Sequence, residues 1–126
     1  MHPDKIRNIC NLSCEDRYGY FIRKVADFEE VWLIKGEGKY VTLGDNAGNR
    51  IIPVWPEKGF AELMIADTWK EFEIEQKPLS DFMQWFEQLQ RDNMKIAVFP
   101  TADFNTVVTT PEEMREHLLE ELRQYE

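Results

Sequence analysis

The sequence has few of the residues on which metal sites and redox chemistry depend. There are two cysteines and two histidines among 126 residues, and His2 and His117 lie at opposite ends of the chain. Because structural zinc takes four ligands, Cys10 and Cys14 with such distant histidines do not predict a zinc site. We expect both cysteines to be reduced thiols, and we predict neither a metal nor another cofactor.

Long apolar runs are also missing. No run approaches the roughly 20 residues that span a membrane, and residues 1–5 lack the basic-then-apolar layout of a signal peptide. We therefore expect a cytoplasmic protein without membrane contact. With no internal repeat, low-complexity tract or linker, residues 1–126 are predicted to form a single domain. Its 43% apolar and 13% aromatic content predicts a packed core.

Basic residues are scarce relative to acidic ones. The chain has 15 Lys and Arg against 24 Asp and Glu, which gives a formal net charge of −9. Such a charge repels phosphate backbones, so we predict no nucleic-acid partner. The same charge would favour encounter with a basic protein partner, although solubility alone also explains it.

The signature motifs of common enzymes do not occur. There is no Gly-x-Ser-x-Gly elbow, Walker loop or dinucleotide fingerprint. His117 falls on the polar side of a predicted helix, where we expect it to be solvated. Glu71, Glu73 and Glu75 would align on one face of a strand, which could serve acid–base catalysis or a divalent metal. A charged solvent-facing surface is the simpler interpretation, and we predict no catalytic residue.

Hydrophobic periodicity predicts the order of the elements. A short helical turn over residues 4–11 precedes a helix capped by Ser13, and the last helix opens with Thr110 and Glu113 as a capping box. Further helices are predicted over residues 57–66 and 79–91, and strands over residues 31–34, 40–43, 51–55, 69–75, 94–99 and 106–109. Residues 94–99 are almost continuously apolar, which predicts a central strand buried on both faces.

The first three strands are separated by glycine-rich turns, at residues 36–38 and 44–49, and are predicted to form an antiparallel meander. Pro53 lacks an N–H group, so the third strand should lie at an edge or break there. The full order is helix, three-strand meander, helix, strand, helix, two strands, helix. It predicts the α+β class, with a mixed, mainly antiparallel sheet on which the helices pack.

An aromatic set gives the candidate binding site. Trp55 and Phe99 each end a predicted strand just before a proline, Pro56 and Pro100. If these two strands are neighbours, the four residues and Trp69 would line one end of the sheet as a binding groove. In this interpretation Trp55 is the aromatic residue expected to be exposed. Ordinary core packing of the same side chains is the alternative.

A series of short motifs runs through the chain from about Ile6 onward. The motifs are Leu12-Ser13, Arg17-Tyr18, Tyr20-Phe21-Ile22, Val25-Ala26-Asp27, Glu30-Val31-Trp32, Pro53-Val54-Trp55-Pro56, Ala61-Glu62, Trp69, Leu79, Phe82, Val98-Phe99-Pro100 and Pro111-Glu112-Glu113. In order and spacing they resemble a bacterial family, the domain of unknown function 2750. The strand-helix-strand-helix layout is more loosely similar to SseB-like domains. The resemblance implies a small bacterial domain without an established activity, and it transfers no catalytic residues.

The predicted function is non-enzymatic: a cytoplasmic bacterial domain that binds a protein partner as a regulator, adaptor or inhibitor. An immunity protein against a basic toxin is one version, motivated by size and charge. The alternative is a small-molecule-binding or hydrolytic domain with an aromatic pocket near Trp55 and Phe99. Because the strand that carries Pro53 could pair only in part with a second copy, we expect a monomer or a weak homodimer.

Overall fold

A computed structural model describes residues 2–44, 48–67, 69–103 and 105–125, which form five helices and seven strands. In chain order these are α1 (Pro3–Cys10), α2 (Cys14–Phe28), β1 (Glu30–Gly36), β2 (Lys39–Tyr40), β3 (Leu43–Gly44), β4 (Arg50–Val54), α3 (Lys58–Asp67), β5 (Glu73–Pro78), α4 (Leu79–Arg91), β6 (Lys95–Val98), β7 (Val107–Thr109) and α5 (Pro111–Arg123). The predicted single-domain α+β class is confirmed. None of the helices in the described part of the chain has the length and apolar character needed to cross a membrane.

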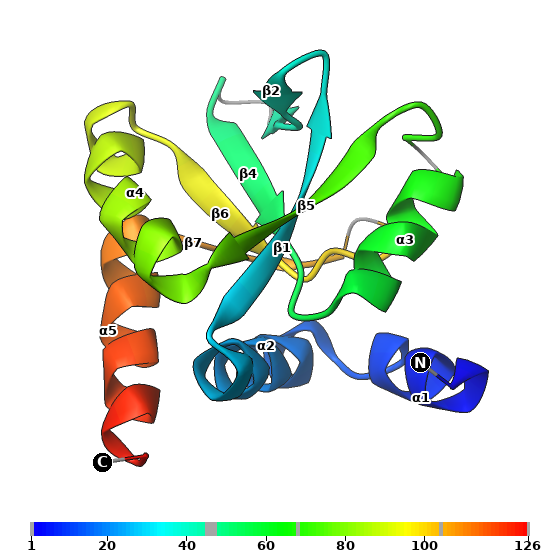
Figure 1. The fold of residues 1–126 in the computed structure, drawn as a ribbon, viewed down its shortest axis with the longest axis horizontal. Coiled ribbons are helices and arrows are strands. Elements are labelled where there is room, and N and C mark those ends of the chain that lie inside the picture. The colour runs from blue at the N-terminus through cyan, green and yellow to red at the C-terminus, as the bar shows by residue number, and fades with distance from the viewer. Residues whose placement is uncertain (1, 45–47, 68, 104, 126) are drawn as a thin grey trace.

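The strands form two sheets that meet at a pair of tryptophans. One sheet has the order β2-β1-β5 and the other β3-β4-β6-β7. All neighbours are antiparallel except β4 and β6, which are parallel. Trp32 and Trp55 exchange two backbone hydrogen bonds of 2.9 Å, which join β1 to the end of β4. In Figure 1, α4 and α5 lie on one side of the strands and α3 on the other, with α2 crossing the end of β1.

Helix caps form where the sequence predicts them. The Ser13 hydroxyl accepts a hydrogen bond from the Asp16 N–H at 3.1 Å, and the Thr110 hydroxyl accepts one from the Glu113 N–H at 3.2 Å. The second hydrogen bond of the predicted capping box, in which the Glu113 carboxylate bonds back to Thr110, is wrong. This carboxylate accepts instead from the Thr109 hydroxyl at 2.9 Å. A hydroxyl is available there since Thr109 ends β7 with its side chain next to the first turn of α5.

The predicted meander is divided between the two sheets. Its second strand, over residues 40–43, splits into β2, which pairs with β1, and β3, which pairs with β4. Between these two strands, the Val41 N–H donates to the Ile34 carbonyl at 2.9 Å, so the chain stays bonded to β1 as far as Val41 and pairs with β4 from Leu43. Part of the predicted turn at residues 44–49 lies outside the described residues.

The strand predicted over residues 69–75 is displaced toward the C-terminus. The segment from Trp69 to Phe72 is a turn, closed by the Phe72 N–H donating to the Trp69 carbonyl at 3.1 Å, and β5 begins at Glu73. Both aromatic side chains pack against the core instead of alternating along a strand. Glu71 therefore precedes β5, and the predicted row of three carboxylates on one strand does not form.

Pro53 lies in a central strand, because β4 runs unbroken between β3 and β6. The prediction of an edge or a break at this residue is wrong. The Val54 carbonyl accepts a hydrogen bond from the Phe99 N–H at 2.9 Å, so Val54 faces β6 and the Pro53 nitrogen faces the other way. On that side the pairing with β3 ends at Ile51 and the bonds to Trp32 begin at Trp55. No ladder bond is therefore lost at the proline.

The core lies between the sheets and the helices. As predicted, β6 is a central strand whose residues Ile96, Ala97 and Val98 are fully buried. Each long helix contributes large apolar side chains to the core: Phe21 and Val25 from α2, Phe60 and Met64 from α3, Phe82 and Phe86 from α4, and Met114 and Leu118 from α5.

The end of α2 offers a site for stabilisation. Glu29 caps this helix in the left-handed region, with φ 55° and ψ 36°, and its side chain is exposed. Glycine adopts this conformation without the steric cost that other residues carry. We expect Glu29→Gly to raise the free energy of unfolding by about 0.5–1 kcal/mol in urea denaturation.

Glu116 provides the matched control for this prediction. It is also an exposed helical glutamate, but it lies inside α5. There glycine should lower the free energy of unfolding by about 1 kcal/mol. Changes of the same sign in both variants would contradict the proposed role of the left-handed cap.

Candidate functional site

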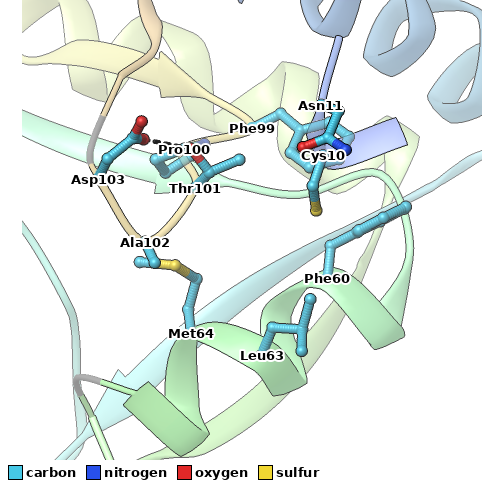
Figure 2. Close-up of a pocket in the computed structure, with 10 residues that line it drawn as sticks. All are labelled: Cys10, Asn11, Phe60, Leu63, Met64, Phe99, Pro100, Thr101, Ala102 and Asp103. Atoms are coloured by element: carbon cyan, nitrogen blue, oxygen red, sulfur yellow. Dashed lines mark hydrogen bonds between the residues drawn. The ribbon is translucent and has the colours of Figure 1, made fainter. Parts of the chain in front are cut away.

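A cavity of about 510 Å³ opens between the end of α1, one face of α3 and the loop that follows β6. Figure 2 shows its lining side chains. Five apolar residues form most of its wall: Phe60, Leu63 and Met64 from α3, with Phe99 and Pro100 from the end of β6. The volume lies within the range of sites that hold small molecules.

The rim of the cavity is polar. Cys10 and Asn11 come from the end of α1, and Thr101 and Asp103 come from the loop after β6. The Thr101 hydroxyl donates to Asp103 Oδ1 at 2.5 Å, and the Asn105 N–H donates to the same oxygen at 3.1 Å. These bonds fix the carboxylate at one side of the opening.

The parallel pairing of β4 and β6 explains where the wall forms. Because the carboxyl ends of parallel neighbours meet at one edge of the sheet, Trp55 and Phe99 directly follow the ends of two adjacent strands. The adjacency on which the predicted groove depended is therefore present. The backbone at Phe99 then turns sharply, with φ 57°. A bulky residue in this region is uncommon and costs about 1–2 kcal/mol. Such strain concentrates at functional sites when the surrounding structure holds it in place.

A buried arginine holds this backbone. Arg17, on the inner face of α2, donates from Nε to the Phe99 carbonyl at 3.3 Å and from Nη1 to the Leu12 carbonyl at 2.7 Å. Its Nη2 donates to the Asn105 carbonyl. One guanidinium group thereby ties the segment after α1 to both ends of the loop after β6, and these are two of the cavity walls.

Arg17 was not among the residues predicted for the site, although the sequence carries a signal for it. Phe21 and Val25 follow Arg17 at intervals of four residues and are fully buried, so all three share one face of α2. An arginine in register with core positions is expected to find buried acceptors, because a buried donor without one is costly.

Two ionisable side chains on the rim have shifted pKa values. Burial raises the pKa of the Cys10 thiol, and the Arg17 charge opposes this shift only in part. The hydrogen bond from Thr101 lowers the pKa of Asp103, and the Asn105 N–H adds to the effect. At neutral pH the rim therefore presents a neutral thiol and an ionised carboxylate.

Trp55 is not exposed, and that expectation was wrong. Its side chain is fully buried, and Nε1 donates to the Pro100 carbonyl at 3.0 Å. Trp55 lies where the two sheets meet, with the half-buried Trp69 packed edge-on at a centroid distance of 6.4 Å. Pro56 is also buried. Of the five predicted binding residues, Phe99 and Pro100 line the cavity, whereas Trp55, Pro56 and Trp69 lie outside its lining.

His117 is exposed on α5, as predicted, but it is not isolated. Its Nδ1 is hydrogen-bonded to the Tyr18 hydroxyl of α2, and the two rings meet edge to face. Burial raises the pKa of Tyr18 to about 12, so this hydroxyl stays protonated at neutral pH. The pair joins α2 to α5 away from the cavity. Across the described residues, no three His, Cys, Asp or Glu side chains come together as metal ligands would.

Comparisons with known proteins identify the family. No curated protein matches the chain. Among solved structures, Tic22 of Anabaena, described as a protein of protein transport, is similar at 15% identity and a TM-score of 0.39 over 73% of this chain. The chain covers 49% of the length of that protein, about half. The looser similarity to SseB-like domains stays a prediction. Residues 18–118 match the model described as "Protein of unknown function (DUF2750)", and the chain belongs to this family.

Proposed function

We propose that this protein is a non-enzymatic binding domain that takes an apolar side chain of a protein partner into the cavity. The observation that supports the proposal is the combination of an apolar wall and a fixed frame. Phe99 and Pro100 form part of the wall, and the three carbonyl contacts of Arg17 hold the loops around them. A preformed pocket loses little conformational entropy on binding, and apolar anchors in such pockets dominate protein interfaces.

Leu63 is the residue of the cavity wall that a partner would contact most directly. Its side chain is 44% exposed although it lies on the cavity wall, next to the buried Phe60 and Met64. A partner side chain in the cavity would cover it. The net charge of −9 favours a basic partner, so a cytoplasmic bacterial adaptor, regulator or inhibitor, for example an immunity protein against a basic toxin, is our specific proposal. We propose that it acts as a monomer or a weak homodimer.

The volume of the cavity also supports a second candidate, the binding of a small apolar molecule. The hydrolytic form of this candidate is less well supported. A thiol acts as a nucleophile through its thiolate, and burial raises the pKa of Cys10. Asp103, with its lowered pKa, is a weak base for activating the neighbouring Thr101 hydroxyl. A thermal-shift screen with metabolites tests this candidate directly.

Leu63→Glu is expected to abolish partner binding without unfolding the protein. A carboxylate on the cavity wall would place a charge against the apolar anchor, which should weaken binding roughly 30-fold or more. Since Leu63 is already partly exposed, the free energy of unfolding should change by less than about 1 kcal/mol. Partners are captured from a lysate of the native host, identified by mass spectrometry, purified and titrated against both proteins.

Leu119→Glu is the matched control. Leu119 is also a partly exposed helical leucine, at 37%, but it lies on α5 outside the cavity lining. The proposal requires that the Leu119→Glu variant bind the partner as the wild type does. Equal loss in both variants, or full retention by Leu63→Glu, would contradict it.

A further inference from the structure

The rim of the cavity carries one ionised side chain that points to the chemistry of the partner. Asp103 is the single charged residue among those that line the cavity in the described structure. Its Oδ1 receives the hydrogen bonds from Thr101 and Asn105, whereas no neighbouring side chain of the described residues donates a hydrogen bond to Oδ2. Oδ1 is therefore held in position, and Oδ2 is available to a hydrogen-bond donor of a partner.

No cation among the described residues forms an ion pair with this carboxylate. Arg17 is the nearby cation, and its charge contributes to the lowered pKa of Asp103. Its three donor groups, however, are directed to the carbonyls of Phe99, Leu12 and Asn105. The C-terminal end of α1, at Cys10, borders the same opening. A helix end of this kind carries a partial negative charge. Asp103 thus supplies a full negative charge at the opening, and the end of α1, whose last turn also carries Arg7, adds only a partial one.

We propose that the cavity recognises a pair of adjacent features in the partner, an apolar side chain followed by a basic one. The apolar side chain packs on the exposed Leu63, over the buried Phe99, and the basic side chain at the opening donates to Asp103 Oδ2. This inference rests on the proposed function and specifies the chemistry of the partner. Arginine suits the position better than lysine, because its planar fork can bind a carboxylate through two donors.

The test uses four five-residue peptides with acetylated and amidated ends. They are identical except at two consecutive inner positions, which are Leu-Arg, Leu-Gln, Leu-Glu or Ala-Arg. Each is titrated into ¹⁵N-labelled protein, and the amide shifts of Leu63, Met64 and Asp103 are followed. We expect Leu-Arg to bind about 3-fold more tightly than Leu-Gln, the scale of an exposed ion pair, and Leu-Glu to bind most weakly. Ala-Arg should bind weakly too, which separates cavity binding from general attraction to an acidic protein.

The Asp103→Asn variant completes the experiment. Its amide oxygen can still accept from Thr101 and Asn105, so the loop is retained while the charge is removed. The preference for Leu-Arg over Leu-Gln should disappear in this variant and should weaken with added salt in the wild type. Equal binding of the three leucine peptides, or a preference that survives in the variant, would overturn the inference and leave the cavity proposal in place. If no peptide shifts the amides of Leu63 and Met64, both fail.

Discussion

Replacing Trp55 with alanine is expected to lower the free energy of unfolding by about 3–5 kcal/mol, the usual cost of truncating a fully buried aromatic residue. Trp55 is 0% exposed and joins the two sheets through its backbone bonds to Trp32. The variant would leave a large void beside Trp69 and an unpaired carbonyl at Pro100. Since small domains have about 5–15 kcal/mol of stability in total, this loss is a large fraction of the free energy of unfolding.

Two variants calibrate this result. Trp55→Phe retains most of the ring volume and loses the Nε1 hydrogen bond to Pro100, so it should cost about 1–3 kcal/mol. Trp85→Ala removes a half-buried tryptophan that packs on Tyr40, and it should cost less than Trp55→Ala. Urea denaturation followed by far-UV circular dichroism is the measurement, because these changes alter the tryptophan fluorescence. A Trp55→Ala variant of nearly wild-type stability would show that this side chain lies on the surface.

Local signals in the sequence were sufficient for the helices and their order. The caps at Ser13 and Thr110 depend on hydrogen bonds within four residues, so they can be read from the sequence alone. The central position of β6 was also predictable, because a strand buried on both faces must be apolar on both faces. The formation of these features depends least on contacts between residues far apart in the sequence.

Strand pairing could not be predicted as well, because it depends on residues far apart in the sequence. The segment at residues 40–43 has the composition of one strand, but its first part finds a partner in β1 and its last part in β4. Pro53 correctly signals a missing donor. Only the arrangement of β3, β6 and Trp32 around it shows that no neighbour needs that donor.

The candidate site was predicted in part for the same reason. The motif before each proline correctly placed Trp55 and Phe99 at the ends of strands, but the adjacency of those strands was a condition of the prediction that only the structure fulfils. The burial of Trp55 follows from the crossing of β1 over the end of β4, which has no local signal. Cys10 and Asp103 lie far apart in the sequence, and folding brings both to the cavity rim.

The Arg17→Met variant is the second change for which we expect a large loss of stability. Methionine has a similar length and keeps the apolar packing, but it removes all three hydrogen bonds to the carbonyls of Leu12, Phe99 and Asn105. Buried acceptors without partners are costly, and hydrogen bonds from charged donors are the stronger ones, so we expect a loss of about 3–5 kcal/mol. Urea denaturation measures it. Arg17→Lys should recover little of the loss, because one ammonium group cannot reproduce the geometry of the guanidinium.

A double-mutant cycle between Arg17 and Phe99 separates two roles of the arginine. If Arg17 holds Phe99 at its φ of 57°, the backbone can relax in Arg17→Met, and this relief of strain offsets part of the loss. Glycine adopts this φ without strain, so a Phe99→Gly background has no strain to relieve. The loss caused by Arg17→Met should then be larger in the Phe99→Gly background, by about 1 kcal/mol. Additive losses would mean that Arg17 only joins the loops, and the conformation of Phe99 at the cavity wall would have to be maintained by its strand and Pro100.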